Sequence, residues 1–138
     1  SDQNSCVENG ELTGNENATK FYRNYNNKND IYYYYLDDGQ FITTDGTLFL
    51  IDNSATDNTT IVSIYITVDV NGLNKKPNRW GHDLFTFQLM NNGKLLPMGA
   101  EGTDFEPEQY CSATNSGKLN GIACTYRALT DKNYWKEL

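Results

Sequence analysis

Oxygen-bearing side chains gather in one stretch of the sequence, the polar loop between residues 69 and 83. Its carboxylate and amide side chains are those of Asp69, Asn71, Asn78 and Asp83. Oxygen ligands of this kind bind Ca²⁺ in proteins. The EF-hand template does not fit, because Asn74 and Trp80 occupy the sixth and twelfth positions, where that template requires Gly and Glu. Two interpretations stay open: a structural calcium site formed by Asp69, Asn71 and Asp83, or a rigid corner in which these side chains bond to their own backbone.

Residue types that could carry catalysis are few. His82 is the only histidine, and the sequence has no Gly-x-Ser-x-Gly motif to supply a nucleophile beside it. The neighbouring carboxylates Asp37 and Asp38 fall at a turn, and those of Glu106 and Glu108 fall in a polar loop. Neither pair has the buried surroundings that the two carboxylates of a glycosidase require. We therefore expect no enzymatic activity, no catalytic residue, and no cofactor apart from the calcium ion considered above.

The cysteines are Cys6, Cys111 and Cys124. The residues between Cys111 and Cys124 are polar and rich in turn formers, which is typical of a loop closed by a disulfide. The alternative is two free thiols; a zinc site is excluded because there is no second histidine and no Cys-x-x-Cys motif. A disulfide predicts an oxidising, extracytoplasmic location. Cys6 is then either a free thiol or the partner of a residue outside the sequence.

Length and charge limit the classes of protein to consider. The 138 residues fit a single domain spanning 1–138, and ten Tyr and six Phe predict a small aromatic core. The formal net charge of −7 argues against nucleic acid and against anionic membrane surfaces as partners. No apolar stretch approaches the roughly 20 residues needed to span a bilayer. Because the sequence starts at Ser1 with no signal-peptide pattern, we expect a processed or trimmed chain whose targeting segment is missing.

The spacing of apolar residues predicts one helix followed by strands. Ala18, Phe21, Tyr22 and Tyr25 share one helical face, and Asn17 is a suitable N-cap. Runs of β-prone residues bounded by turn formers then predict strands. They lie at residues 31–36, 41–42, 47–51, 60–68, 84–89 and 94–96, with a hairpin turn at Asn92-Gly93. The sequence therefore predicts an α+β fold in which a short N-terminal helix packs on a small antiparallel sheet.

The longest predicted strand, residues 60–68, has one face that is wholly apolar. Side chains alternate between the two faces of a strand, so one face carries Val62, Ile64, Ile66 and Val68. We expect this apolar face to be the core face. We also expect Phe87, in the neighbouring strand 84–89, to be buried with Ile64.

Four consecutive tyrosines, residues 32–35, allow two interpretations. Their rings form either a stacking platform for sugars or a partner chain, or part of the core. Alternation along a strand would send two rings to each face, so we expect at least two of the four to pack inside the protein.

Short motifs follow one another from Val68 to the C-terminus, over about half of the chain. They are Asp69-Val-Asn-Gly72, Lys76-Pro-Asn78, Gly81-His-Asp-Leu-Phe85, Asn92-Gly-Lys-Leu-Leu-Pro-Met-Gly99 and Gly121-Ile-Ala-Cys124. In this order and spacing they resemble the globular heads of type IV pilin-like proteins and type II secretion pseudopilins. The first half of the chain matches those proteins only as a helix end and variable loops.

The resemblance implies a structural subunit, a pilin or pseudopilin of a type IV pilus or type II secretion filament. In such proteins a long N-terminal helix anchors the subunit in the inner membrane and later packs in the filament core, while a small antiparallel sheet lies against the outer half of that helix. The implied partners are other pilin or pseudopilin subunits, and the membrane is contacted only through the missing helix. The implied location is the cell surface or periplasm. The resemblance also supports the Cys111–Cys124 bridge, which lies near the C-terminus.

A second class of protein stays open beside the filament subunit. A secreted carbohydrate-binding or adhesin-type β-domain would use Trp80, the tyrosines at 32–35 and a calcium ion to hold a sugar.

Overall fold

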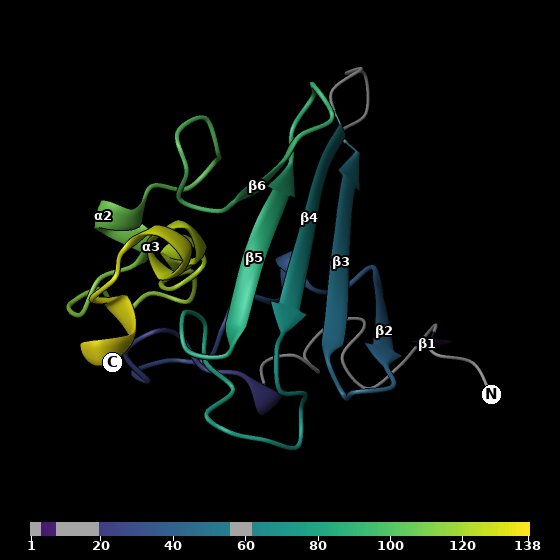
Figure 1. The fold of residues 1–138 in the computed structure, drawn as a ribbon, viewed down its shortest axis with the longest axis horizontal. Coiled ribbons are helices and arrows are strands. Elements are labelled where there is room, and N and C mark those ends of the chain that lie inside the picture. The colour runs from purple at the N-terminus through teal and green to yellow at the C-terminus, as the bar shows by residue number, and fades with distance from the viewer. Residues whose placement is uncertain (1–3, 8–19, 56–61) are drawn as a thin grey trace.

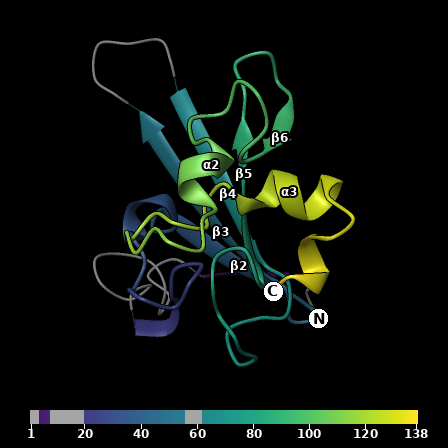
Figure 2. The ribbon, with the colours of Figure 1, turned by 90° about the vertical axis from the view of Figure 1, so that its left-hand side faces the viewer.

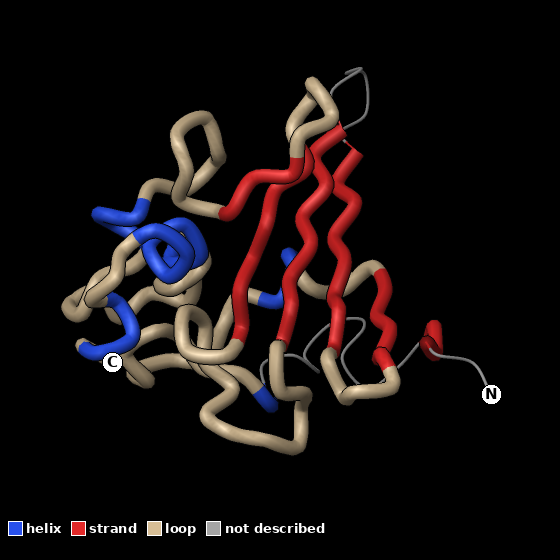
Figure 3. The backbone as a smooth tube through the Cα atoms, in the orientation of Figure 1, coloured by secondary structure: helices blue, strands red, loops and turns tan. Residues whose placement is uncertain are grey.

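The computed structural model describes residues 4–7, 20–55 and 62–138 (Figure 1). Within these residues, six antiparallel strands form one sheet in the order β1-β2-β3-β4-β5-β6. The strands are β1 (Asn4–Val7), β2 (Gly39–Thr43), β3 (Leu48–Ala55), β4 (Val62–Asp69), β5 (Leu84–Leu89) and β6 (Leu95–Pro97). Figure 3 shows them side by side as a meander. Most of the predicted strands are therefore confirmed, because antiparallel neighbours need only short turns between β-prone runs.

The helices whose bounds lie within the described residues are short, and the longest of these lies near the C-terminus. They are the 3-10 turn η1 (Tyr33–Tyr35), α2 (Pro107–Tyr110), α3 (Cys124–Thr130) and the 3-10 turn η2 (Tyr134–Lys136). The fold is thus predominantly β. The predicted α+β class, with a short N-terminal helix packed on the sheet, is wrong.

Local hydrogen bonds explain why the predicted N-terminal helix does not continue to Tyr25. Asn17 and Ala18 lie outside the described residues, and after Lys20 and Phe21 the chain leaves the helical conformation. The side-chain oxygen of Asn24 accepts hydrogen bonds from the backbone N–H groups of Lys28 and Asn29, at 2.9 and 3.1 Å. Such side-chain bonds favour a turn over a helix.

The tyrosine run also departs from its prediction, because it forms η1 rather than a strand. Ile31 and Leu36, which flank the run, are fully buried and fix it against the core. Tyr33 and Tyr35 pack against the core, whereas Tyr32 and Tyr34 are exposed. Two of the four rings therefore pack against the core but stay half-buried, and a turn rather than a strand places them there.

The sheet separates two layers of covering structure (Figure 2). Residues 20–38 and the loop after α2 lie on one side, and α3 lies on the other. The main core forms on the first side, against the sheet surface that we call the core face. This face carries Leu48, Leu50, Asp52, Tyr65, Thr67, Asp69, Leu84, Thr86 and Gln88, all buried. Tyr22, Ile31, Leu36, Trp80, Met98 and Ile122 complete that core.

The prediction of the core face was therefore wrong. Tyr65, Thr67 and Asp69 of β4 are buried, whereas Ile64 and Ile66 on the opposite side are only half-buried. Phe87 of β5 is half-buried as well.

Hydrogen bonds make this polar core face stable. The hydroxyls of Thr67 and Thr86 lie 2.7 Å apart, and Trp80 Nε1 donates to Thr86 Oγ1 at 3.0 Å. The Tyr22 hydroxyl donates to Asp69 Oδ2 at 2.6 Å. Buried polar groups with partners avoid most of the cost of losing water.

The disulfide between Cys111 and Cys124 is present and joins the end of α2 to the start of α3, with a Cα–Cα distance of 4.9 Å. Cys6 lies in β1, in register with Phe41 of β2. Within the described residues, no helix has the length and apolar character needed to cross a membrane.

Candidate functional site

The most unusual surface of the molecule is the side of the sheet opposite the core face, which we call the apolar face. It carries Phe41, Phe49, Ile51, Ile64, Ile66, Val68, Phe85, Phe87 and Leu89. The strand register places these side chains in rows across β2 to β5, so that Ile51, Ile66 and Phe87 are direct neighbours. The rings of Phe41 and Phe49 stack with centroids 4.7 Å apart. Apolar and aromatic cross-strand pairs of this kind stabilise a sheet.

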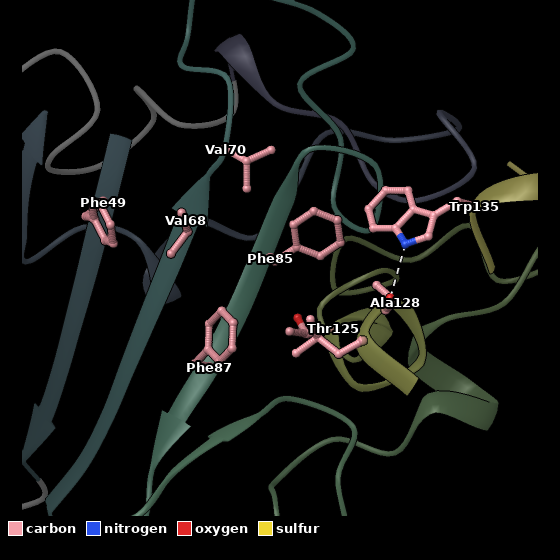
Figure 4. Close-up of a pocket in the computed structure, with 9 residues that line it drawn as sticks. Phe49, Val68, Val70, Phe85, Phe87, Thr125, Ala128 and Trp135 are labelled. Carbon is pink, nitrogen blue, oxygen red and sulfur yellow. Dashed lines mark hydrogen bonds between the residues drawn. The ribbon is translucent and has the colours of Figure 1, made fainter. Parts of the chain in front are cut away.

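A groove runs between the apolar face and the C-terminal elements (Figure 4). Its volume is about 370 Å³. The sheet contributes Phe49, Val68, Phe85 and Phe87 to one wall. Ala128, Leu129 and Trp135 form the other wall.

The C-terminal wall of the groove is held in place while its apolar surface stays accessible. Trp135 Nε1 donates to the backbone oxygen of Ala128 at 3.1 Å, so the polar atom of the indole is already satisfied. The Trp135 ring packs edge-on against Phe85, with centroids 5.6 Å apart. Leu129 nevertheless stays 65% exposed and Trp135 52% exposed. Contiguous apolar surface is a common feature of interaction sites, so the groove is the candidate site of this molecule.

The chemistry of the groove suits packing rather than catalysis. Among its lining residues, only Thr125 carries a polar side chain, and its hydroxyl accepts a hydrogen bond from the backbone N–H of Thr86 at 3.0 Å. None of the described residues that line the groove is titratable. Its occupant would therefore be recognised by shape and apolar contact alone.

The predicted calcium loop forms a tight corner between β4 and β5. Asp69 is fully buried, and its Oδ1 accepts from the backbone N–H groups of Asn71 and Gly72, at 3.3 and 3.1 Å. Burial raises the pKa of Asp69 to about 6; the hydrogen bond from Tyr22 opposes this shift and the charge of Asp83 adds to it. Gly72 has φ +81, and a Cβ there would lie 2.4 Å from the backbone oxygen of Gly46, so this position requires glycine.

The second carboxylate of the corner, Asp83, is held in the same way. Its two oxygens accept from the backbone N–H groups of Asn78 and Arg79, each at 2.8 Å. The side-chain oxygens of Asn71 and Asn78 are buried without a hydrogen-bond partner among the described residues. The bonds of Asp69 and Asp83 are those expected for the rigid corner. A calcium site at Asp69, Asn71 and Asp83 stays a prediction.

Sequence reasoning missed a cluster of three carboxylates, those of Asp37, Asp38 and Asp52. One oxygen of each lies within 4.8 Å of the others, close enough for a shared cation. Asp52 is buried at the core face, and burial, followed by a hydrogen bond with Asp38 and the negative charges of Asp38 and Asp37, raises its pKa to about 8. The turn residues Asp37 and Asp38 were visible in the sequence, but only the pairing of β2 with β3 brings Asp52 to them.

The other side chains singled out from the sequence are structural. Trp80 is fully buried, so its ring cannot stack on a sugar. His82 is half-buried, with Nε2 2.9 Å from the backbone oxygen of Tyr25, and burial lowers its pKa. Glu106 and Glu108 are exposed around the first turn of α2.

Comparison of the chain with protein-family models, with curated protein sequences and with solved structures finds no match. The described residues form a β-sheet domain that buries a face of mixed polar and apolar side chains and leaves much of the apolar face uncovered.

Proposed function

We propose that this chain is a structural subunit, a pilin or pseudopilin of a type IV pilus or type II secretion filament, and that it acts through assembly and surface contacts. Two observations support the proposal. The first is the resemblance of its second half to the heads of such subunits. The second, which carries the most weight, is the apolar face that the described residues cover only beside α3 and η2.

The occupant that the proposal assigns to the apolar face is an apolar helix of a neighbouring subunit, because the helices of such subunits pack in the filament core. Such a helix would fill the groove between β5 and the C-terminal elements and cover the row formed by Ile51, Ile66 and Phe87. Each half-buried aliphatic or aromatic side chain that loses its remaining water contact contributes roughly 1 kcal/mol, at about 25 cal/mol per Å². In this proposal, apolar contacts alone hold the helix on the apolar face.

A matched pair of isoleucines tests the proposal in cells that make the protein. Ile66→Lys places a charge in the centre of the apolar face, where a packed helix would bury it. Ile42→Lys makes the same change on β2, at a position that is 41% exposed and in register with Leu48 of the core face. We expect Ile66→Lys to remove the protein from filaments sheared off the cells and Ile42→Lys to leave it there, as measured by immunoblotting.

Circular dichroism of the two purified variants controls for unfolding. If both variants keep the native spectrum and both enter filaments equally, the apolar face is not the assembly surface. If no filament fraction contains even the unmodified protein, the chain is not a filament subunit.

A further inference from the structure

Four of the cationic side chains of this acidic protein line one groove, which we call the basic groove. They are Lys20, Arg23, Lys76 and Arg79. The groove has a volume of about 430 Å³, and no Asp or Glu is among the described residues that line it. Backbone hydrogen bonds hold its two cationic segments together, from Arg23 N to Asn78 O at 2.9 Å and from Trp80 N to Arg23 O at 3.1 Å. Backbone hydrogen bonds of the folded chain therefore hold the two sides of the basic groove together.

The charges of the basic groove are not neutralised within the described part of the chain. The ion pair found there joins Lys118 to Asp30, at 3.1 Å, and involves none of the four cations. Lys20, Arg23 and Lys76 are exposed, and Arg79 is half-buried. Four like charges around one groove repel one another, so an anionic group placed between them is favoured.

A complementary acidic segment lies elsewhere on the same molecule, at residues 101–108, which we call the acidic loop. Glu101, Asp104, Glu106 and Glu108 are all exposed there, and residues 95–117 contain no Lys or Arg. The backbone N–H of Asp104 donates to Gln88 Oε1 at 2.9 Å, which fixes the loop near the last residues of β5. The basic groove is instead lined by Arg79, which precedes the first residue of β5 in the chain. The two charged surfaces thus lie toward opposite ends of the sheet.

We propose that the basic groove receives the acidic loop of a second copy of this chain, so that copies associate head to tail along the strand direction. The contact joins two different surfaces of the chain. Such a contact can be repeated from copy to copy, and it builds an open filament unless the rotation between successive copies closes a ring. The inference rests on the proposed function, for which it names the surface contact between neighbouring subunits. Complementary charge at such an interface selects the partner and its orientation.

Zero-length carbodiimide cross-linking tests the contact with the chain as it is, in low salt and at high protein concentration. Isotopically labelled and unlabelled copies are mixed, so that a cross-link joining a labelled and an unlabelled peptide must lie between two molecules. We expect such mixed cross-links from Lys20 or Lys76 to Glu106 or Glu108. They should decrease as salt rises above about 0.1 M, where the screening length is about 10 Å.

A matched pair of variants separates this contact from general attraction between charges. Arg79→Gln removes one charge of the basic groove and keeps both reactive lysines, whereas Lys132→Gln makes the same charge change at an exposed position outside the groove. We expect Arg79→Gln to lower the yield of the mixed cross-links about two- to fivefold, the effect of one exposed charge pair, and Lys132→Gln to leave it unchanged.

Three outcomes would overturn the inference: no mixed cross-links, mixed cross-links that join the basic groove to carboxylates outside the acidic loop, or equal yields in the two variants. The result can be told apart from that of the filament test. Loss of Ile66→Lys from filaments together with absent cross-links would reject the head-to-tail contact alone. Cross-links in a protein that never enters filaments would reject the filament role alone.

Discussion

The two faces of the sheet reverse the distribution that strand patterns predict. The core face buries the polar side chains of Asp52, Thr67 and Asp69, and the apolar face leaves Ile64 and Ile66 half-exposed. The burial of each face therefore depends on which segment of the chain covers it, and not on the polarity of its side chains alone. Residues 20–38 cover the core face and bring hydrogen-bond partners such as the Tyr22 hydroxyl. Within the described residues, the apolar face is covered only beside α3 and η2.

The largest expected effect is a difference in the free energy of unfolding between two side-chain truncations, one on each face. Leu50→Ala at the fully buried core face should lower the free energy of unfolding by about 2–5 kcal/mol, because it leaves a cavity. Ile66→Ala on the half-exposed apolar face should cost about 1 kcal/mol, since much of its side chain already contacts water. Urea unfolding with an unchanged m-value measures both. Equal losses would mean that the two faces are equally buried in solution.

Local patterns in the sequence predicted β2 to β6, whereas β1 was not predicted and the expected strand at 31–36 is a turn. β5 (Leu84–Leu89) has the predicted bounds, and β6 follows the Asn92-Gly93 turn as expected. The pattern did not predict which face is covered, because that depends on the distant segment around Tyr22. The helix α3 was missed although Cys124, Thr125 and Ala128 have helical spacing, since a stretch this short gives a weak signal.

The second prediction concerns the corner that supports the polar core face. Asp69→Ala removes three hydrogen bonds and should lower the free energy of unfolding by about 2 kcal/mol. The loss is no larger because the substitution also removes a buried charge. Thermal unfolding of both proteins in chelator and in excess calcium measures the effect. We expect the same loss in both solutions.

A calcium site at the corner would give a different result. The melting temperature of the unmodified domain would then rise by several degrees with calcium, and the rise would disappear in Asp69→Ala. The sequence indicated the polar residues of this corner. It did not reveal that backbone N–H groups and Tyr22 supply their partners, because those contacts depend on the fold.

A smaller effect should appear in the pH dependence of stability. The pKa of Asp52 is raised from 3.8 to about 8, so the folded protein binds this proton more tightly than the unfolded chain does. Its contribution is therefore fully present below about pH 4 and is lost as the pH rises through about 8. We expect Asp52→Asn to flatten the decrease in melting temperature over this range.

The pH prediction needs a comparison of slopes and not of absolute melting temperatures. Melting temperatures of both proteins between pH 4 and 9 should converge at the acidic end and separate toward the alkaline end, with the Asn variant higher. Parallel curves would show that Asp52 does not carry its proton in the folded protein. The cluster of Asp37, Asp38 and Asp52 would then be a set of independent acids.

The measurement that tests the central claim most directly is the accessibility of the apolar face before and after assembly. Ile66→Cys and Ile42→Cys are labelled with a maleimide in the isolated domain and in sheared filaments, and the label is located by peptide mass. Because the apolar face is the assembly surface in this account, position 66 should react in the isolated domain and be protected in filaments, while position 42 reacts in both. Equal reaction of position 66 in the two states would contradict it.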